Sequence, residues 1–138
     1  MSDDARPVRG IVFAHGDMAQ GLVDAVRKIS GTHGDALTAL SNDGKRPEQL
    51  VTELREALGD DDAVIFTDLQ AGSCATCALA ASGRGRIAVL CGANLPMLLD
   101  FVFHRGLPLD ELADRLVERG REAVRRLRFP AGEGPGGA

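Results

Sequence analysis

The sequence predicts an α/β fold: a doubly wound, mainly parallel four-stranded sheet with helices on both faces. Nearly all-apolar runs alternate along the chain with amphipathic runs of helical spacing. Strands that lack a polar face are typical of parallel sheets covered on both sides. The length of 138 residues is enough for one core and too short for two ordinary domains.

Four short apolar runs are predicted as strands, at residues 8–14, 36–40, 63–67 and 86–91. Right-handed crossovers between parallel strands place all their carboxyl ends at one edge of the sheet. The loops after the strands should meet there, at residues 15–17, 41–45, 68–73 and 92–96. Ligands of α/β proteins bind at this edge, so we expect the functional residues in these loops.

Amphipathic runs predict helices at residues 18–29, 47–58, 73–81, 96–104 and 109–127. Pro47 suits the first turn of the second helix, and Gly59 suits its end. Gly120 lies inside the last helix, where glycine costs about 1 kcal/mol relative to alanine. We predict a single domain over residues 1–128 and a flexible Gly/Pro tail over 129–138.

The composition excludes several classes of protein. A net charge of −4 gives no reason to expect nucleic acid as a partner. No apolar run reaches the roughly 18–20 residues of a membrane span, and the N-terminus lacks the pattern of a signal peptide. Three cysteines, an odd number, do not resemble a disulfide framework. These features predict a soluble cytoplasmic protein.

His15 is the most informative residue of the chain. It follows the first strand and precedes the first helix, where free backbone N–H groups and the helix dipole favour an anion. The neighbouring Gly16 allows close approach of the backbone. A histidine there can be a phosphoryl acceptor, a general base, a metal ligand or a structural residue.

Asp68 closes the third strand and reaches the same edge of the sheet. An aspartate there can hydrogen-bond one nitrogen of His15 and fix its tautomer, or it can serve as a loop or cap residue. Gly72 and Ser73 precede a helix, and the hydroxyl of Ser73 can cap that helix, contact a phosphate, or do both. The Gly-x-Ser-x-Gly elbow of serine hydrolases is absent.

Cys74 and Cys77 form a Cys-Ala-Thr-Cys motif at a helix start. The spacing allows a thiol redox function, but two small buried residues in a closely packed helix explain it as well. Cys91 and His15 do not complete a recognisable zinc-ligand pattern with them.

The chain resembles the enzyme IIA domain of the mannose class of the bacterial phosphoenolpyruvate-dependent sugar phosphotransferase system. Four segments carry the resemblance in the family's order: residues 11–16 ending in His-Gly, residues 64–68 with Gly72 and Ser73, residues 92–98 with Gly-Ala-Asn-Leu-Pro-Met-Leu, and residues 120–124. The resemblance spans about residues 8–127. Its ordered set of motifs is far more specific than the His-Gly pair alone.

The resemblance implies that His15 accepts a phosphoryl group from the phosphocarrier protein HPr and passes it to an enzyme IIB partner. Asp68 would hydrogen-bond His15 and steady the phosphohistidine. The phosphate would be bound by Gly16, Gly72 and Ser73, together with backbone N–H groups of the first helix. No metal and no bound cofactor is expected. Membranes would be involved only indirectly, through a permease.

The resemblance also implies contacts with other chains. Leu69, Met97 and Leu98 are candidates for an apolar docking surface, although Met97 and Leu98 can equally belong to the core. The family fold is commonly a homodimer whose antiparallel edge strand is exchanged between subunits. Enzyme IIB is not expected as a fused domain: it is either a separate chain or missing.

The chain departs from the family pattern at three positions. Ala71 replaces the first glycine of the Gly-Gly-Ser-Pro loop, Cys74 replaces its proline, and Ala14 stands where a hydroxyl residue is frequent. Three alternatives stay open: a regulatory phosphoacceptor of an incomplete system, the phosphotransfer subunit that serves dihydroxyacetone kinase, and a thiol redox protein. The segment 92–98 favours the mannose class over the dihydroxyacetone kinase subunit.

Overall fold

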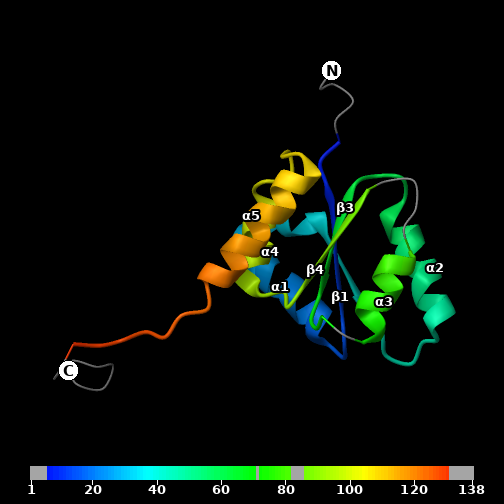
Figure 1. Cartoon of the computed structure of the whole chain (residues 1–138), viewed down its shortest axis with the longest axis horizontal. Helices are drawn as coiled ribbons and strands as arrows, with labels where there is room; N and C mark the ends of the chain where they lie inside the picture. The colour runs from blue at the N-terminus through cyan, green and yellow to red at the C-terminus, as the bar shows by residue number, and fades with distance from the viewer. Residues whose placement is uncertain (1–5, 71, 82–85, 131–138) are drawn as a thin grey trace.

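One parallel β-sheet organises the chain, with helices on both of its faces (Figure 1). The computed structural model describes residues 6–70, 72–81 and 86–130. The elements are β1 (Arg9–Ala14), α1 (Met18–Ser30), the 3-10 helix η2 (Gly31–Ala36), β2 (Leu37–Ser41), α2 (Pro47–Leu58), β3 (Ala63–Thr67), α3 (Ser73–Ala80), β4 (Ile87–Cys91), α4 (Leu95–Val102) and α5 (Leu109–Glu122). The predicted doubly wound parallel sheet is confirmed.

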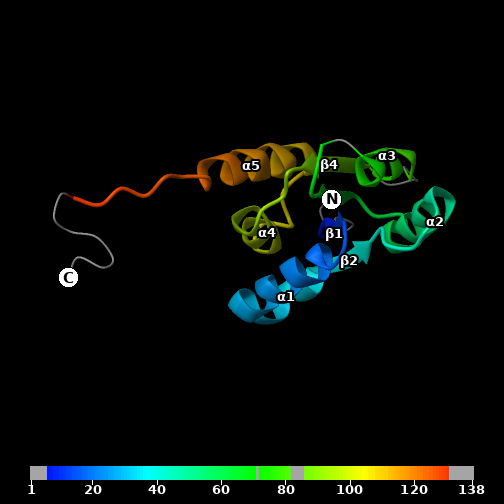
Figure 2. The ribbon, with the colours of Figure 1, turned by 90° about the horizontal axis from the view of Figure 1, so that it is seen from below.

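The strands pair in parallel in the order β2-β1-β3-β4. The central strands β1 and β3 are almost fully buried, as their apolar sequences predict. In their register Phe13 is opposite Thr67. The residues that follow these two strands therefore leave the sheet side by side, at the lower edge in Figure 1, which Figure 2 shows from below.

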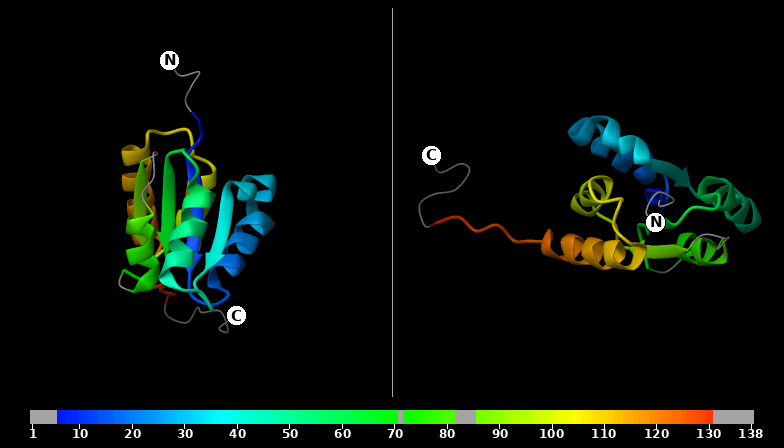
Figure 3. Two further views of the ribbon diagram at one scale, coloured as in Figure 1. Left: turned by 90° about the vertical axis from the view of Figure 1, so that its right-hand side faces the viewer. Right: turned by 90° about the horizontal axis from the view of Figure 1, so that it is seen from above.

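Alternating side chains of the central strands divide the core into two layers. Val12 and Phe66 belong to the layer under α1, α4 and α5, whereas Phe13 and Ile65 belong to the layer under α2 and α3. Figure 3 shows the two groups of helices on opposite sides of the sheet. Phe66 meets Phe101 edge to face with ring centroids 5.3 Å apart, a favoured aromatic geometry.

The last helix differs from its prediction. The other predicted strands and helices agree with the structure within two residues, but α5 ends at Glu122, so a helix over 123–127 was a wrong expectation. Val124 and Leu127 are 79% and 77% exposed. Without a surface to bury these side chains, the helical pattern lacks the packing that sustains most helices in proteins.

The segment after α5 runs away from the sheet (Figure 1). The predicted tail at 129–138 lies mostly outside the described residues, since only Phe129 and Pro130 are described, and both are exposed. The single-domain boundary at 128 stays a prediction. Within the described ranges, no helix has both the length and the apolar character needed to cross a bilayer.

Gly10 in β1 leaves room for α4 to pack on the sheet. A Cβ at this position would lie 2.5 Å from Cε2 of Phe101 and 2.8 Å from Cδ2 of Leu37. Both neighbours are core side chains with almost no exposure. The glycine therefore sets the distance between β1 and its helix layer.

We predict that Gly10→Ala lowers the free energy of unfolding by about 1–3 kcal/mol, the usual effect of overpacking a core. Gly21→Ala is the matched control, because a Cβ at this position in α1 has nothing within 4 Å. It should raise stability by up to about 1 kcal/mol through helix propensity. Urea denaturation of both variants measures this, and equal midpoints would contradict the packing argument.

Candidate functional site

His15 directly follows the central strand β1. Gly16 comes next with a φ of 58°, in the left-handed region that suits glycine. Asp17 then precedes α1 as its N-cap residue, with no hydrogen bond from its side chain to the helix. The short turn brings the first N–H groups of α1, which have no acceptor within the helix, close to His15. The side chain of His15 remains 45% exposed.

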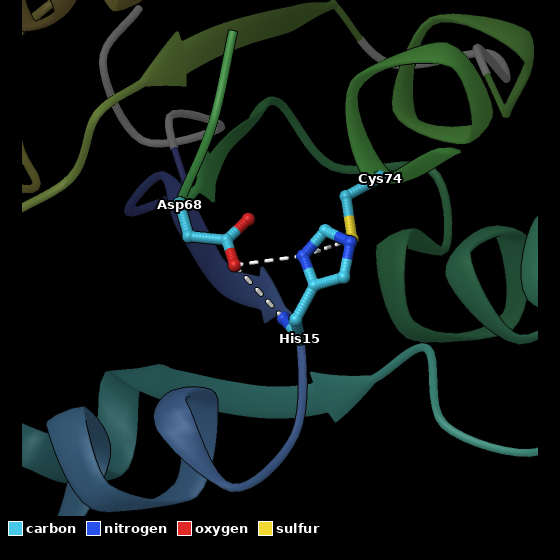
Figure 4. A group of neighbouring side chains, drawn as sticks. All are labelled: His15, Asp68 and Cys74. Carbon is cyan, nitrogen blue, oxygen red and sulfur yellow. Dashed lines mark hydrogen bonds and ion pairs between the residues drawn. The ribbon is translucent and has the colours of Figure 1, made fainter. Parts of the chain in front are cut away.

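Asp68 holds His15 through a single carboxylate oxygen. Its Oδ2 lies 2.8 Å from Nδ1 of His15 and accepts the backbone N–H of the same residue at 3.0 Å (Figure 4). A carboxylate can only accept, so Nδ1 carries the proton in the neutral ring. Nε2 then keeps its lone pair. The contact predicted for Asp68 is therefore present, and it fixes both the tautomer and the direction of the ring.

The charge of Asp68 is stabilised by His15. Burial acts to raise the pKa of Asp68, but the backbone and ring hydrogen bonds from His15, with its charge, outweigh burial, so this pKa lies below its ordinary value. The carboxylate is ionised at neutral pH as a result. An ionised partner at Nδ1 favours any step that places positive charge on the ring.

The start of α3 forms the opposite side of the site. Gly72 has a φ of 109° and is the N-cap of α3. Ser73 is therefore the first helical residue, and among the residues that the structure describes no side chain caps this helix. Capping by Ser73 is thus excluded. Its hydroxyl instead accepts a hydrogen bond of 3.3 Å from Nδ2 of Asn42, and its side chain is exposed.

Asn42 is a residue of the site that the sequence interpretation did not single out. It follows β2, in the loop predicted to reach this edge, and its backbone N–H donates to the carbonyl of Ala14 at 3.3 Å. Its Oδ1 is buried without a hydrogen-bond partner, and so is Oδ1 of Asp68, within the described ranges. The sequence signal that could have identified Asn42 is its position in the loop after β2, which was predicted to reach this edge of the sheet.

Cys74 was also not expected at the ring of His15. Its Sγ lies 4.0 Å from Nδ1 of His15. Burial, with the charge of Asp68, raises the pKa of Cys74 to about 11, and burial raises the pKa of Cys77 as well. Both groups are protonated thiols at neutral pH, whereas thiol redox chemistry uses the thiolate. Buried, protonated thiols do not favour the redox alternative.

The three candidate docking residues, Leu69, Met97 and Leu98, differ in exposure. Leu69 is 58% exposed beside Asp68 and is available to a partner. Met97 is only 4% exposed, so its assignment to the docking surface was wrong. Asn94 accepts the backbone N–H of Met97 and donates to the carbonyl of Gly120, which turns the methionine inward against α5. Leu98 is fully buried as well.

The assembled site has a ring nitrogen with a lone pair, on a side chain that is 45% exposed, next to the N-termini of α1 and α3. Such an arrangement suits a nucleophilic nitrogen that attacks an anionic group, because helix N-termini stabilise negative charge. Gly16, Gly72, Ser73, Asp68 and His15 all lie at this edge, as predicted. A phosphoryl group is one anion that this arrangement can accept.

Comparison with solved structures gives the same fold in proteins of one system. The mannose/sorbose-specific IIA subunit of the phosphotransferase system from Enterococcus faecalis superposes with a TM-score of 0.80 at 25% identity, covering 91% of this chain and 98% of that one. Component EIIA from Streptococcus agalactiae superposes with a TM-score of 0.79 at 24% identity, covering 86% of this chain and 96% of that one. The IIA protein associated with the fucose utilization operon of Streptococcus pneumoniae superposes with a TM-score of 0.70 at 22% identity, covering 88% of this chain and 95% of that one.

Sequence comparison identifies the family directly. No curated protein matches the chain. The family model EIIA-man, described as the PTS system fructose IIA component, matches residues 10–118, which include His15 and Asp68. The match covers most of the chain and agrees with the structural neighbours. The chain therefore belongs to the mannose-class enzyme IIA family of the phosphotransferase system.

Proposed function

We propose that the chain is a phosphocarrier that accepts a phosphoryl group from HPr on Nε2 of His15. It would pass the group to an enzyme IIB partner during sugar uptake, and it would act in the cytoplasm. The observation that carries the proposal is the contact of 2.8 Å between Nδ1 of His15 and Oδ2 of Asp68. That contact leaves Nε2 as the nucleophile.

The acceptor step needs little covalent machinery. The lone pair of Nε2 forms a bond to phosphorus while the bond from phosphorus to the donor group of HPr breaks. The proton of Nδ1 stays in place, so the phosphorylated ring becomes cationic. The ionised Asp68, held beside Nδ1, offsets that positive charge. Transfer to enzyme IIB reverses the same bond changes.

The phosphoryl oxygens would be bound by the two helix starts. Gly16 and Gly72 have positive φ values and carry no side chain, so their backbone can approach the anion closely. The first N–H groups of α1 and α3 lack acceptors within their helices, although that of Met18 already donates to the carbonyl of His15 at 3.3 Å. The exposed hydroxyl of Ser73 supplies a further donor, with Asn42 as its own donor partner. Preorganised donors of this kind stabilise a transferring phosphoryl group.

The exposure of the site supports a protein as donor. His15 is 45% exposed, and Leu69 beside it is 58% exposed. A shallow polar site with an apolar neighbour suits brief docking of another carrier protein. A regulatory phosphoacceptor, or the subunit that serves dihydroxyacetone kinase, would use His15 in the same way. The three functions differ only in their partners.

We propose further that the chain forms a homodimer, as the family resemblance implies. The exposed edge of β4 has one strand neighbour among the described residues, β3. Val124, Leu127 and Phe129, which follow the end of α5, are exposed. Unpaired strand edges and exposed apolar side chains both favour association with a second chain.

His15→Ala should abolish phosphorylation and leave the fold intact, because the side chain is half-exposed and outside the core. The measurement is incubation with phosphoenolpyruvate, enzyme I and HPr, followed by mass analysis of the modified residue. His33→Ala is the matched control, since His33 is an exposed histidine of η2 remote from the sheet edge. Its phosphorylation should equal that of the wild type. A phosphate on the His15→Ala variant would overturn the assignment.

Asp68→Asn should slow phosphoryl acceptance by about 10- to 100-fold, by analogy with the partners that orient metal-ligating histidines. The amide keeps the shape of the carboxylate but removes the charge that offsets the cationic ring. Asp24→Asn, an exposed carboxylate of α1, is the control for charge and should leave the rate unchanged. Equal rates for both variants would remove Asp68 from the mechanism.

The same variant should change the pH dependence of stability. The folded pKa of Asp68 is lowered from 3.8, so its stabilising effect is present above that value and is lost as the pH falls through the folded pKa. Asp68→Asn should therefore be less stable than the wild type at neutral pH. The difference should shrink in acid, as urea denaturation at stepwise lower pH can measure.

The paired substitutions Val124→Glu and Leu127→Glu should convert a dimer into a monomer, because charged side chains oppose burial at an apolar contact. Light scattering after size-exclusion chromatography measures the mass against the chain mass of 14.5 kDa. Arg126→Glu, between them in sequence, is the control and should remain dimeric. A monomeric wild type would disprove the dimer.

A further inference from the structure

We infer that His15, Asp68 and Cys74 form a binding site for a zinc-type divalent transition metal ion. The spacing of the cysteines did not predict this set, because Asp68 and Cys74 lie 53 and 59 residues after His15 along the chain. We infer also that the bound ion stops phosphoryl acceptance. That second part rests on the proposed function of His15.

The three ligand atoms lie within 4.8 Å of one another. Nδ1 of His15 is 2.8 Å from Oδ2 of Asp68 and 4.0 Å from Sγ of Cys74, and Figure 4 shows the ring between the carboxylate and the sulfur. A tetrahedral zinc ion would separate nitrogen from oxygen by about 3.3 Å and nitrogen from sulfur by about 3.6 Å. The nitrogen–oxygen and nitrogen–sulfur distances need to change by about half an ångström, and the oxygen and the sulfur, which lie within 4.8 Å of each other, need to approach to about 3.5 Å.

The donor set suits zinc rather than calcium or magnesium. Imidazole, thiolate and carboxylate together match the borderline-soft character of Zn²⁺, whereas hard cations require oxygen ligands alone. Two of the ligands would be anionic, so their charge balances that of the ion. The exposed side of His15 leaves a fourth position for water and a path by which the ion can enter.

A second observation points to a ligand beside Asp68. Its Oδ1 is buried and accepts no hydrogen bond among the described residues. A buried acceptor without a partner is unfavourable by about 1–3 kcal/mol. A cation held by this carboxylate would compensate that oxygen electrostatically or coordinate it directly.

Metal binding would change the tautomer on which the proposed phosphotransfer depends. Coordination uses the lone pair of Nδ1, so the proton of Nδ1 moves to Nε2 through water. The thiol of Cys74 releases its proton to solvent. Nε2 then carries a hydrogen and has no lone pair to attack phosphorus. Occupation of the site and phosphoryl acceptance are therefore mutually exclusive.

The test compares the wild type with Cys74→Ser and Cys77→Ser. Both cysteines are buried in α3, but Cys77 does not belong to the ligand group, and its Sγ contacts the carbonyl of Pro47 at 3.9 Å. Calorimetric titration with zinc chloride should show one ion per chain for the wild type and for Cys77→Ser. Cys74→Ser should bind more than about 100-fold more weakly, because a lost ligand exceeds the 10- to 100-fold effect of a lost orienting residue.

Cobalt supplies an independent readout of the ligands. Co²⁺ in the wild type and in Cys77→Ser should give a thiolate-to-cobalt charge-transfer band, and Cys74→Ser should give none. Circular dichroism of each variant establishes that it is folded, and Cys74→Ala serves as a second variant if the serine form unfolds. Equal zinc affinity in wild type and Cys74 variants, or no binding at all, overturns the site.

The regulatory part is tested with phospho-HPr purified away from enzyme I. Each protein is compared with its own metal-free rate, and zinc should slow the wild type and Cys77→Ser but not Cys74→Ser. Zinc binding without slower transfer overturns the regulatory step. If the metal-free wild type accepts no phosphate, the proposed function and this step both fail, while calorimetry still decides the metal site.

Discussion

The site depends on one carboxylate oxygen that binds the main chain and the ring of the same histidine. Oδ2 of Asp68 can do so only because β1 and β3 are neighbours in a parallel sheet and end at the same level. The buried apolar strands that form the core thus also position the ring of His15. The same packing of β1 and β3 that forms the core therefore also holds His15 and Asp68 together.

The fold was largely predictable, because its signals are local and repeated. Uninterrupted apolar runs identify β1 and β3 as strands buried on both faces, and helical spacing identifies the elements between them. Apolar spacing predicts a helix wrongly where the apolar side chains are not buried in the structure. Leu127 continues the apolar spacing of α5, yet the helix ends at Glu122, because a periodic pattern cannot show whether a packing surface lies opposite.

The site was predictable in its residues but not in all its contacts. Topology brings His15 and Asp68 to one edge, and their hydrogen bond follows from the strand order. The place of Cys74 beside the ring follows instead from the direction in which α3 leaves Gly72, which no spacing encodes. Met97 likewise turned inward because Asn94 bridges to Gly120 of a helix remote in sequence.

The register of β1 against β3 limits how the chain can vary in length. A residue inserted within either strand would shift His15 relative to Asp68 by about 3.3 Å and reverse the faces of all side chains that follow it in the strand. An insertion in the loop between β2 and α2 leaves that pairing untouched. Length changes that keep the His15–Asp68 contact are thus confined to the loops, and the lengths of β1 and β3 are part of what holds these two residues together.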